Sequence, residues 1–285
     1  MNQLLDDLIK VMTLERLETD LFRGESRDIG SPQVFGGQVL GQALAAATAT
    51  AEDRVVHSLH AYFLRRGDFN SPIVYEVDRA LDGKHFSSRR VVAIQHGRQI
   101  FNMSASFQSA EAGVDHQIPM PDVAQPESLP DVESYYREAA DKLPAAARRM
   151  LEQKRPFEFR PVQRPDHLRR EKSAGLKQIW FRAVDRLADD EALHRSLLAY
   201  VSDFHLLDTA LKPHGISMIS PKLVIASIDH AMWFHRSVRV DDWLLYSMDS
   251  PSASGARGFT RGSVFARDGR LVASAAQEGL IRVTS

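Results

Sequence analysis

The chain has 285 residues, 44% hydrophobic and 26% charged, which favours one or two globular domains over disorder or a fibrous class. A formal net charge of −1 gives no general phosphate-binding surface, so a nucleic-acid-binding protein is not expected. The absence of cysteine excludes disulfides, thiolate metal sites and a cysteine nucleophile.

No part of the sequence predicts a membrane anchor or a targeting signal. The longest apolar runs fall short of the roughly 20 residues that cross a bilayer, and the N-terminus is acidic and amphipathic. We therefore expect a cytoplasmic protein without stable membrane insertion.

The first predicted elements are two helices. Leu4, Leu5, Leu8, Met12 and Leu14 give residues 2–18 an apolar stripe at helical spacing. A second helix is predicted to start near Gly36 and Gly37, before an Ala- and Leu-rich run. The two small residues would let a ligand approach the free N–H groups of a helix start, but tight helix–sheet packing explains them equally well.

Residues 55–107 predict strands rich in β-branched and aromatic residues, separated by the turn signals Arg66-Gly-Asp, Asp82-Gly-Lys and His96-Gly-Arg. One helix followed by hairpin-linked strands indicates an α+β fold in which an antiparallel sheet wraps around the helix. Residues 114–174 then hold eight of the 13 prolines and no glycine, which is typical of a stiff connector.

After the connector the first arrangement returns. A helical segment at residues 199–208 is followed by strands near 223–234, 243–248, 258–266 and 271–277. Local matches such as His96-Gly-Arg with Asp268-Gly-Arg recur at offsets near 170 residues. The sequence thus predicts one helix-plus-sheet unit used twice, divided as 1–113, 114–174 and 175–285.

Known catalytic motifs are largely absent. There is no Gly-x-Ser-x-Gly elbow, no nucleotide-binding glycine pattern and no His-x-His or His-Glu-x-x-His motif, so neither a serine hydrolase nor a metal site is predicted. The helical segment 199–208 carries two acids, Asp203 and Asp208, and periodicity alone does not choose between them. Asp203, Ser227 and Gln277 could converge inside the second unit, where a carboxylate can deprotonate a water that a hydroxyl and an amide hold.

Several segments carry a family resemblance. They are Val34-Phe-Gly-Gly-Gln-Val, His57-Ser-Leu-His-Ala-Tyr-Phe-Leu, Asp229-His-Ala-Met-Trp-Phe-His-Arg, Ala253-Ser-Gly-Ala-Arg-Gly-Phe and Gln277-Glu-Gly. In this order and spacing they resemble the acyl-CoA thioesterase II family over essentially the whole chain. The resemblance implies two tandem hotdog folds and a hydrolase that converts fatty acyl-CoA to fatty acid and CoA, without a cofactor or a covalent intermediate.

The resemblance also implies site residues. It assigns the catalytic acid to Asp203, the amide to Gln277 and the position of a family threonine to Ser227, which keeps the hydroxyl but lacks the methyl group. Asp208 then becomes a structural acid. The N–H groups at the predicted helix start, Gly36 and Gly37, are expected to receive the thioester oxygen. Hotdog units commonly pair sheet to sheet, so we also expect a homo-oligomer, either a dimer or a tetramer.

Two alternatives remain open. Asp203-Phe-His205 places an acid and a histidine close together, which also suits an enoyl-CoA hydratase of the hotdog class. A non-catalytic acyl-CoA sensor would share the substrate-binding residues, but it would not release the thiol.

Overall fold

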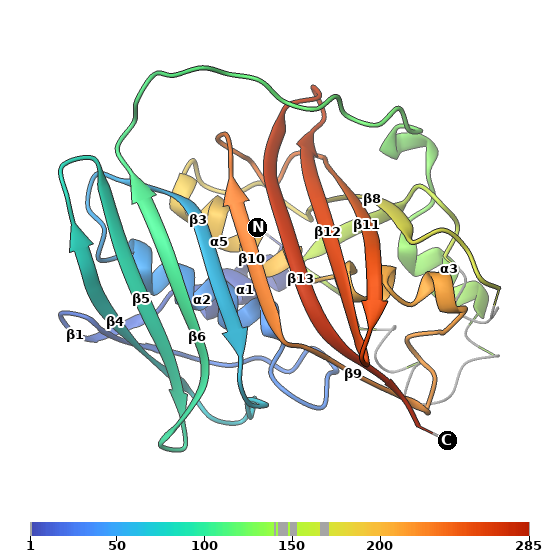
Figure 1. Ribbon diagram of the computed structural model, residues 1–285, viewed down its shortest axis with the longest axis horizontal. Coiled ribbons are helices and arrows are strands. Elements are labelled where there is room, and N and C mark those ends of the chain that lie inside the picture. The colour runs from blue at the N-terminus through green and yellow to red at the C-terminus, as the bar shows by residue number, and fades with distance from the viewer. Residues whose placement is uncertain (1, 140, 142–147, 149–152, 166–170, 285) are drawn as a thin grey trace.

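A computed structural model of the chain describes residues 2–139, 141, 148, 153–165 and 171–284, and it has two helix-plus-sheet units side by side (Figure 1). The helical elements are α1 (Gln3–Met12), α2 (Gly36–Thr48), η1 (Pro126–Ser128), α3 (Val132–Ala139), α5 (Glu191–Ser202), α6 (Leu206–Thr209) and η3 (Lys212–His214). The strands are β1 (Glu15–Glu18), β2 (Leu21–Gly24), β3 (Val55–Phe63), β4 (Ile73–Asp82), β5 (Phe86–Gln95), β6 (Arg98–Gln108), β7 (Phe157–Pro161), β8 (Leu176–Ala183), β9 (Leu223–Ser227), β10 (Asp229–Phe234), β11 (Leu244–Ser254), β12 (Arg257–Ala266) and β13 (Leu271–Val283).

The described strands form one continuous antiparallel sheet. Its order is β1-β2-β4-β5-β6-β3-β10-β13-β12-β11-β8-β7, with β9 paired to β13. The first unit supplies the strands up to β3, and the second unit supplies those from β10 onward. The pairing of β3 with β10, in register at His60 and Ala231, joins the two units. The predicted α+β class with tandem antiparallel sheets is confirmed.

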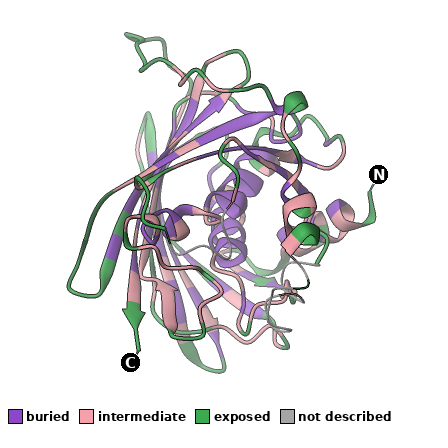
Figure 2. Cartoon of the chain, turned by 90° about the vertical axis from the view of Figure 1, so that its right-hand side faces the viewer, coloured by how far each residue is buried: buried purple, intermediate pink, exposed green. Residues whose placement is uncertain are grey.

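Helices α2 and α5 fill the centre of the molecule, where Figure 2 shows them almost entirely buried. They pack closely because α2 presents glycines to α5. A Cβ atom on Gly41 would lie 2.9 Å from the backbone oxygen of Ser196, and one on Gly37 would lie 2.2 Å from that of Tyr200. The start of α2 therefore lies beside the end of α5.

Two helix predictions are wrong in their extent. The N-terminal helix does not reach residue 18, because the backbone becomes extended at Thr13, whose hydroxyl donates to the oxygen of Ile9, and β1 follows. The segment 199–208 is not one helix, because α5 ends at Ser202 and His205 has a φ of 72° before α6 begins. A non-glycine residue with this backbone conformation interrupts a helix.

The sequence repeat is shifted by one residue at the central strands. His60 and His230 occupy matching places in the two repeated segments. In the structure His60 is exposed, whereas His230 is 0% exposed. Adjacent strand residues point to opposite faces, so a one-residue shift in alignment exchanges the faces.

The connector predicted at 114–174 includes residues outside the described part of the chain. Its described residues contain η1, α3 and β7, and β7 pairs with β8 at the sheet edge. Gln117 also donates to the oxygen of Gly269, so the start of the segment crosses the β12–β13 turn (Figure 1). The division into 1–113, 114–174 and 175–285 stays a prediction. Within the described residues, no helix is long and apolar enough to cross a bilayer.

Candidate active site

Asp203 lies where helix α5 ends. It is the C-cap residue, and its side chain is only 5% exposed. The helix ends there because Phe204 and His205 turn the chain into α6. The carboxylate thus stands at the boundary of the core and points toward the start of α2.

Ser227 and Gln277 reach Asp203 from neighbouring strands. Ser227 is the last residue of β9, and Gln277 lies on β13, which pairs with β9 from Gly279 onward. The Gln277 Nε2 atom donates to Asp203 Oδ1 at 2.6 Å and lies 3.1 Å from Ser227 Oγ. The Ser227 hydroxyl lies farther from Asp203 Oδ1, at 3.4 Å. The amide of Gln277 is therefore the strongest fixed partner of this carboxylate oxygen.

A buried histidine lies behind Gln277. His230 Nδ1 is 3.3 Å from Gln277 Nε2, and its Nε2 is 3.0 Å from the hydroxyl of Ser202. Burial lowers the pKa of His230 below its ordinary value of 6.5, although the Asp203 carboxylate acts in the opposite direction. The ring is therefore neutral near pH 7. The partners assign the proton to Nε2, because Nδ1 must accept from the amide of Gln277.

The start of helix α2 faces the other carboxylate oxygen. A Cβ atom on Gly36 would lie 2.7 Å from Asp203 Oδ2, so this oxygen stands directly beside the first turn of α2. The N-cap residue is Phe35, whose side chain has no hydrogen-bond acceptor for the helix N–H groups. Unpaired N–H groups and the helix dipole make such a start favourable for a developing negative charge.

A cavity of about 190 Å³ opens beside these groups. Gly36 and Ser227 line it, together with residues of α2, the end of β3 and the β6 strand. Its deeper walls are apolar and buried: Val34, Val39, Ile100 and Phe101. A ligand that enters this cavity reaches both the helix start and the hydroxyl of Ser227.

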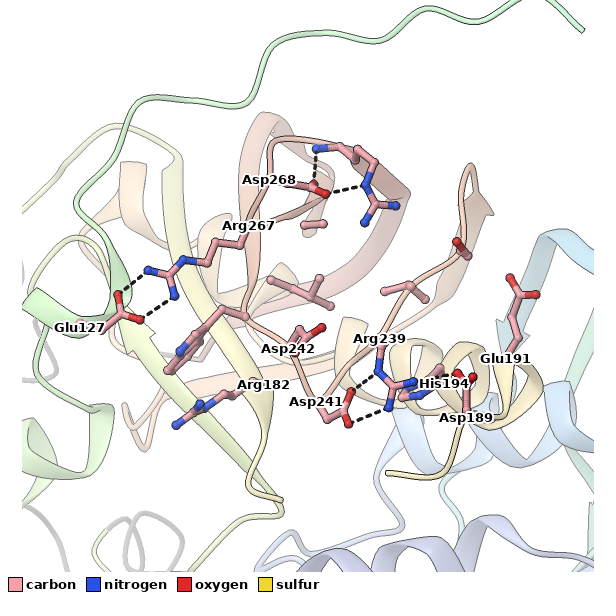
Figure 3. Close-up of a pocket in the computed structure, with 16 residues that line it drawn as sticks. Glu127, Arg182, Asp189, Glu191, His194, Arg239, Asp241, Asp242, Arg267 and Asp268 are labelled. Carbon is pink, nitrogen blue, oxygen red and sulfur yellow. Dashed lines mark hydrogen bonds and ion pairs between the residues drawn. The ribbon is translucent and has the colours of Figure 1, made fainter. Parts of the chain in front are cut away.

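A larger cleft of about 800 Å³ lies at the opposite end of α5, around Glu191 and His194 (Figure 3). Its arginines and carboxylates are held in ion pairs, several with one another and the others with neighbouring residues. Arg239 pairs with Asp241, and Arg267 binds Glu127 through two hydrogen bonds. Since α5 has 12 residues, this cleft is separated from Asp203 by about 18 Å along the helix. Its size therefore does not make it the site of the carboxylate chemistry.

The structure brings Asp203, Ser227 and Gln277 together, as the sequence predicted, and it sets Gly36 and Gly37 at the start of α2. Asp208 lies outside this group and forms a 2.5 Å ion pair with Lys177. His205 also lies outside it, because its Nδ1 is 3.1 Å from Lys177 Nζ and its ring packs on Phe159. The hydratase alternative paired Asp203 with His205, and the structure does not bring these two side chains together.

The sequence did not single out His230 as part of the site. Its signal was present in the Asp229-His-Ala-Met segment, but only strand register shows that this histidine points inward. Among the described residues, no three His, Asp or Glu side chains form a group that could hold a metal ion.

Comparisons with known proteins identify the family of the chain. Two family models match, the acyl-CoA thioesterase N-terminal domain at residues 23–108 and acyl-CoA thioesterase at residues 147–280. Acyl-CoA thioesterase 2 of Haemophilus influenzae is 41% identical over 283 residues, which cover 99% of each chain. Human acyl-coenzyme A thioesterase 8 is 42% identical over 96% of this chain and 88% of its own length.

Solved structures give the same result. The acyl-CoA thioesterase II TesB2 of Mycobacterium marinum superposes with a TM-score of 0.79 at 40% identity, over 98% of this chain and 99% of that one. A hotdog-fold protein from Alicyclobacillus acidocaldarius, 16% identical, has a TM-score of 0.78 over 98% of this chain and 99% of its own, and it supports the fold alone. With both units matched by family models and full-length relatives above 40% identity, the chain belongs to the acyl-CoA thioesterase family and has the double-hotdog fold.

Proposed function

We propose that Asp203 is the general base of this thioesterase and that Ser227 and Gln277 position the attacking water. As a member of the acyl-CoA thioesterase family, the chain hydrolyses acyl-CoA to a fatty acid and CoA. The observation that carries the residue assignment is the 2.6 Å hydrogen bond from Gln277 to Asp203 Oδ1. This bond fixes one carboxylate oxygen and leaves Oδ2 facing the start of α2.

The proposed reaction uses one water molecule and no covalent intermediate. Asp203 takes a proton from the water as its oxygen attacks the thioester carbonyl carbon. The N–H groups of Gly36 and Gly37 stabilise the resulting oxyanion at the helix start. The C–S bond then breaks, which releases a fatty acid that carries the oxygen of the water, together with the CoA thiolate. The proton held by Asp203 passes to this thiolate.

Neutral His230 has a positioning role in this scheme. Its Nδ1 accepts a hydrogen bond from the amide of Gln277, which keeps Nε2 of Gln277 turned toward Asp203. The opposite amide orientation would bring the Gln277 oxygen against the carboxylate, and two acceptors repel each other. His230 thus selects the productive orientation without touching the substrate.

The test measures thiol release from acyl-CoA by Asp203→Asn and Gln277→Ala, each checked for unchanged thermal unfolding. We expect kcat to fall by at least about 100-fold in each variant, since each removes a fixed group that acts on the water. Unchanged kcat in both variants would refute the assignment, whatever the substrate. Ser128→Ala is the control, because Ser128 is exposed and its hydroxyl donates to the oxygen of Gln125, outside the Asp203 group.

The absence of a covalent intermediate has its own test. A single turnover in ¹⁸O-labelled water is expected to place the label in the fatty acid and none in Asp203. A nucleophilic carboxylate would form a mixed anhydride, and hydrolysis at its Asp203 carbonyl would place the label in Asp203 and an unlabelled oxygen in the fatty acid. Hydrolysis at its acyl carbonyl would leave Asp203 unlabelled in every turnover, so that route is tested with hydroxylamine, which would convert the anhydride to an Asp203 hydroxamate that peptide mass spectrometry detects.

The cellular setting and assembly belong to the same proposal. A cysteine-free chain with this activity suits a cytoplasmic role in fatty acid metabolism. A homo-oligomer, a dimer or tetramer, is supported by aromatic side chains on the outer face of the sheet, where Tyr62, Trp233 and Phe259 are each at least 36% exposed. Light scattering on Trp233→Glu and on the unchanged chain tests whether this face pairs.

A further inference from the structure

Two consecutive arginines line the cavity that leads to the proposed catalytic group. Arg65 and Arg66 follow the end of β3, and both side chains are exposed, whereas the other end of the cavity is formed by Gly36 and Ser227. The arginines therefore lie at the mouth of the cavity. A ligand that extends from the reacting carbonyl through this cavity to solvent passes the two arginines.

The loop that carries these arginines is held firmly. The N–H groups of Leu64 and Arg65 both donate to the oxygen of Ile100, at 2.9 and 3.1 Å. The oxygen of Gly67 accepts from the N–H of Val34 at 3.0 Å, which ties the loop to the segment that leads into α2. The backbone that carries the two arginines is thus fixed relative to the segment that leads into Gly36.

The charges of the two arginines are not neutralised within the described part of the chain. Neither guanidinium has a carboxylate within 4.0 Å there, whereas Arg239, Arg267 and Arg270 of the larger cleft are paired with its acids. Arg65 Nη1 donates to the backbone oxygen of Gln99 at 2.6 Å, which orients the group but leaves its charge uncompensated. Two uncompensated guanidinium groups at a cavity mouth favour a polyanion.

We propose that Arg65 and Arg66 bind the phosphate groups of CoA, and that the apolar cavity holds the uncharged arm between the phosphates and the thioester. This inference rests on the proposed function of Asp203. The reacting carbonyl, the uncharged arm and the phosphates follow one another along acyl-CoA, and each has a suitable group of residues in the cavity lining. The reacting carbonyl meets Gly36 and Ser227, the uncharged arm lies along Val34 and Phe63, and the phosphates meet the two exposed guanidinium groups.

The test compares two substrates that share one acyl group. One is the acyl-CoA, and the other is the acyl thioester of N-acetylcysteamine, which has the same reacting bond but no phosphate. In Arg65→Ala and Arg66→Ala we expect KM for acyl-CoA to rise about tenfold each, the size of one charge-assisted hydrogen bond, with kcat nearly unchanged. With the phosphate-free thioester, kcat/KM should stay within about twofold of the unchanged chain.

A binding measurement avoids catalysis altogether. Adenosine 3′,5′-bisphosphate should inhibit the unchanged chain competitively, and its inhibition constant should rise with salt because the contact is electrostatic. That constant should rise about tenfold in each arginine variant. Arg98→Ala is the matched control, because Arg98 is also exposed and lies outside the cavity lining.

Either of two results would overturn the inference. One is an unchanged KM for acyl-CoA and an unchanged inhibition constant for the bisphosphate in a variant that carries both Arg65→Ala and Arg66→Ala. The other is an equal loss of kcat/KM with both substrates, which would mean that the arginines support the loop rather than the phosphates. Failure of the Asp203 proposal is visible separately, because Asp203→Asn would then keep kcat with the phosphate-free thioester as well.

Discussion

Gly36→Ala tests the proposed position of the Asp203 carboxylate. The added Cβ would lie 2.7 Å from Asp203 Oδ2 and 3.0 Å from Phe63 Cε1. Since ordinary contact begins at 3.4 Å, the carboxylate must move by about 0.7 Å, the difference between 3.4 and 2.7 Å. A displacement of this size in a catalytic group lowers the rate by about 10- to 100-fold. Alanine is a better helix former than glycine, so the fold should not be weakened.

The assay is thiol release at saturating acyl-CoA, together with thermal unfolding of the same sample. We expect kcat to fall about 30-fold with no loss of melting temperature. Gly37→Ala gives the contrast, because its Cβ would lie 2.2 Å from the backbone oxygen of Tyr200 in α5. That atom cannot move without separating the helices, so this variant should lose about 1–3 kcal/mol of stability. A Gly36→Ala variant that keeps kcat within about twofold would refute the reasoning.

Three further outcomes follow from the contacts. Ser227→Ala should lower kcat less than Gln277→Ala, because the Ser227 hydroxyl is 3.4 Å from Asp203 Oδ1 and the Gln277 amide is 2.6 Å away. Ser227→Thr should retain turnover, and a larger loss of kcat in Ser227→Ala than in Gln277→Ala would contradict this order. Burial lowers the pKa of His230 below 6.5, so the unfolded chain binds more protons than the folded chain as pH falls through 6.5. The free energy of unfolding should therefore decline below that pH, and urea titrations of His230→Gln should show a shallower decline. Arg89 is 2% exposed and donates to Thr50 and Asp82, so Arg89→Met should lose at least about 2 kcal/mol in urea unfolding while the folded fraction keeps its kcat.

The sequence predicted the repeated helix-and-sheet plan because its signals are local. The hairpins at Gly83 and Gly97 follow turn residues, and His96 and Gly97 both adopt positive φ, at 50° and 70°. The end of α5 was not predictable in the same way. Apolar spacing continues through Phe204 and Leu211, and the break depends on the left-handed backbone at His205, a conformation that histidine adopts more often than most residues but that is uncommon for any non-glycine residue.

The candidate site needed information that periodicity does not contain. Asp203 and Asp208 are both compatible with the apolar stripe, and the choice between them came from the family resemblance. In the structure the choice has a physical basis, because Lys177 neutralises Asp208 whereas Gln277 and Ser227 surround Asp203. These partners are 24 to 74 residues away from the acids along the chain. Strand register decides such contacts, and a shift of one residue would turn Gln277 out of the core.

The two repeated units differ at their helix ends, and this difference explains why one carboxylate site stands out. A repeat would predict a second site where α2 ends and α5 begins. There, however, α2 is followed by Ala49 and Thr50, and both oxygens of Thr50 accept hydrogen bonds from buried Arg89. The position that Asp203 holds in the second unit thus has no acid in the first unit and is occupied by internal hydrogen bonds.

The starts of α2 and α5 also differ, because only α5 has a side chain that caps its first turn. At α5 the side chain of Asp190 accepts hydrogen bonds from the N–H groups of Ala192 and Leu193, at 2.9 and 3.2 Å, so the first turn is already capped. At α2 the N-cap residue Phe35 has no side-chain acceptor, and Gly36 leaves room beside the first turn. The uncapped start and the unneutralised acid therefore meet at only one of the two places that the repeat creates within the described chain. A second catalytic group would require both Asp190 and Arg89 to be replaced.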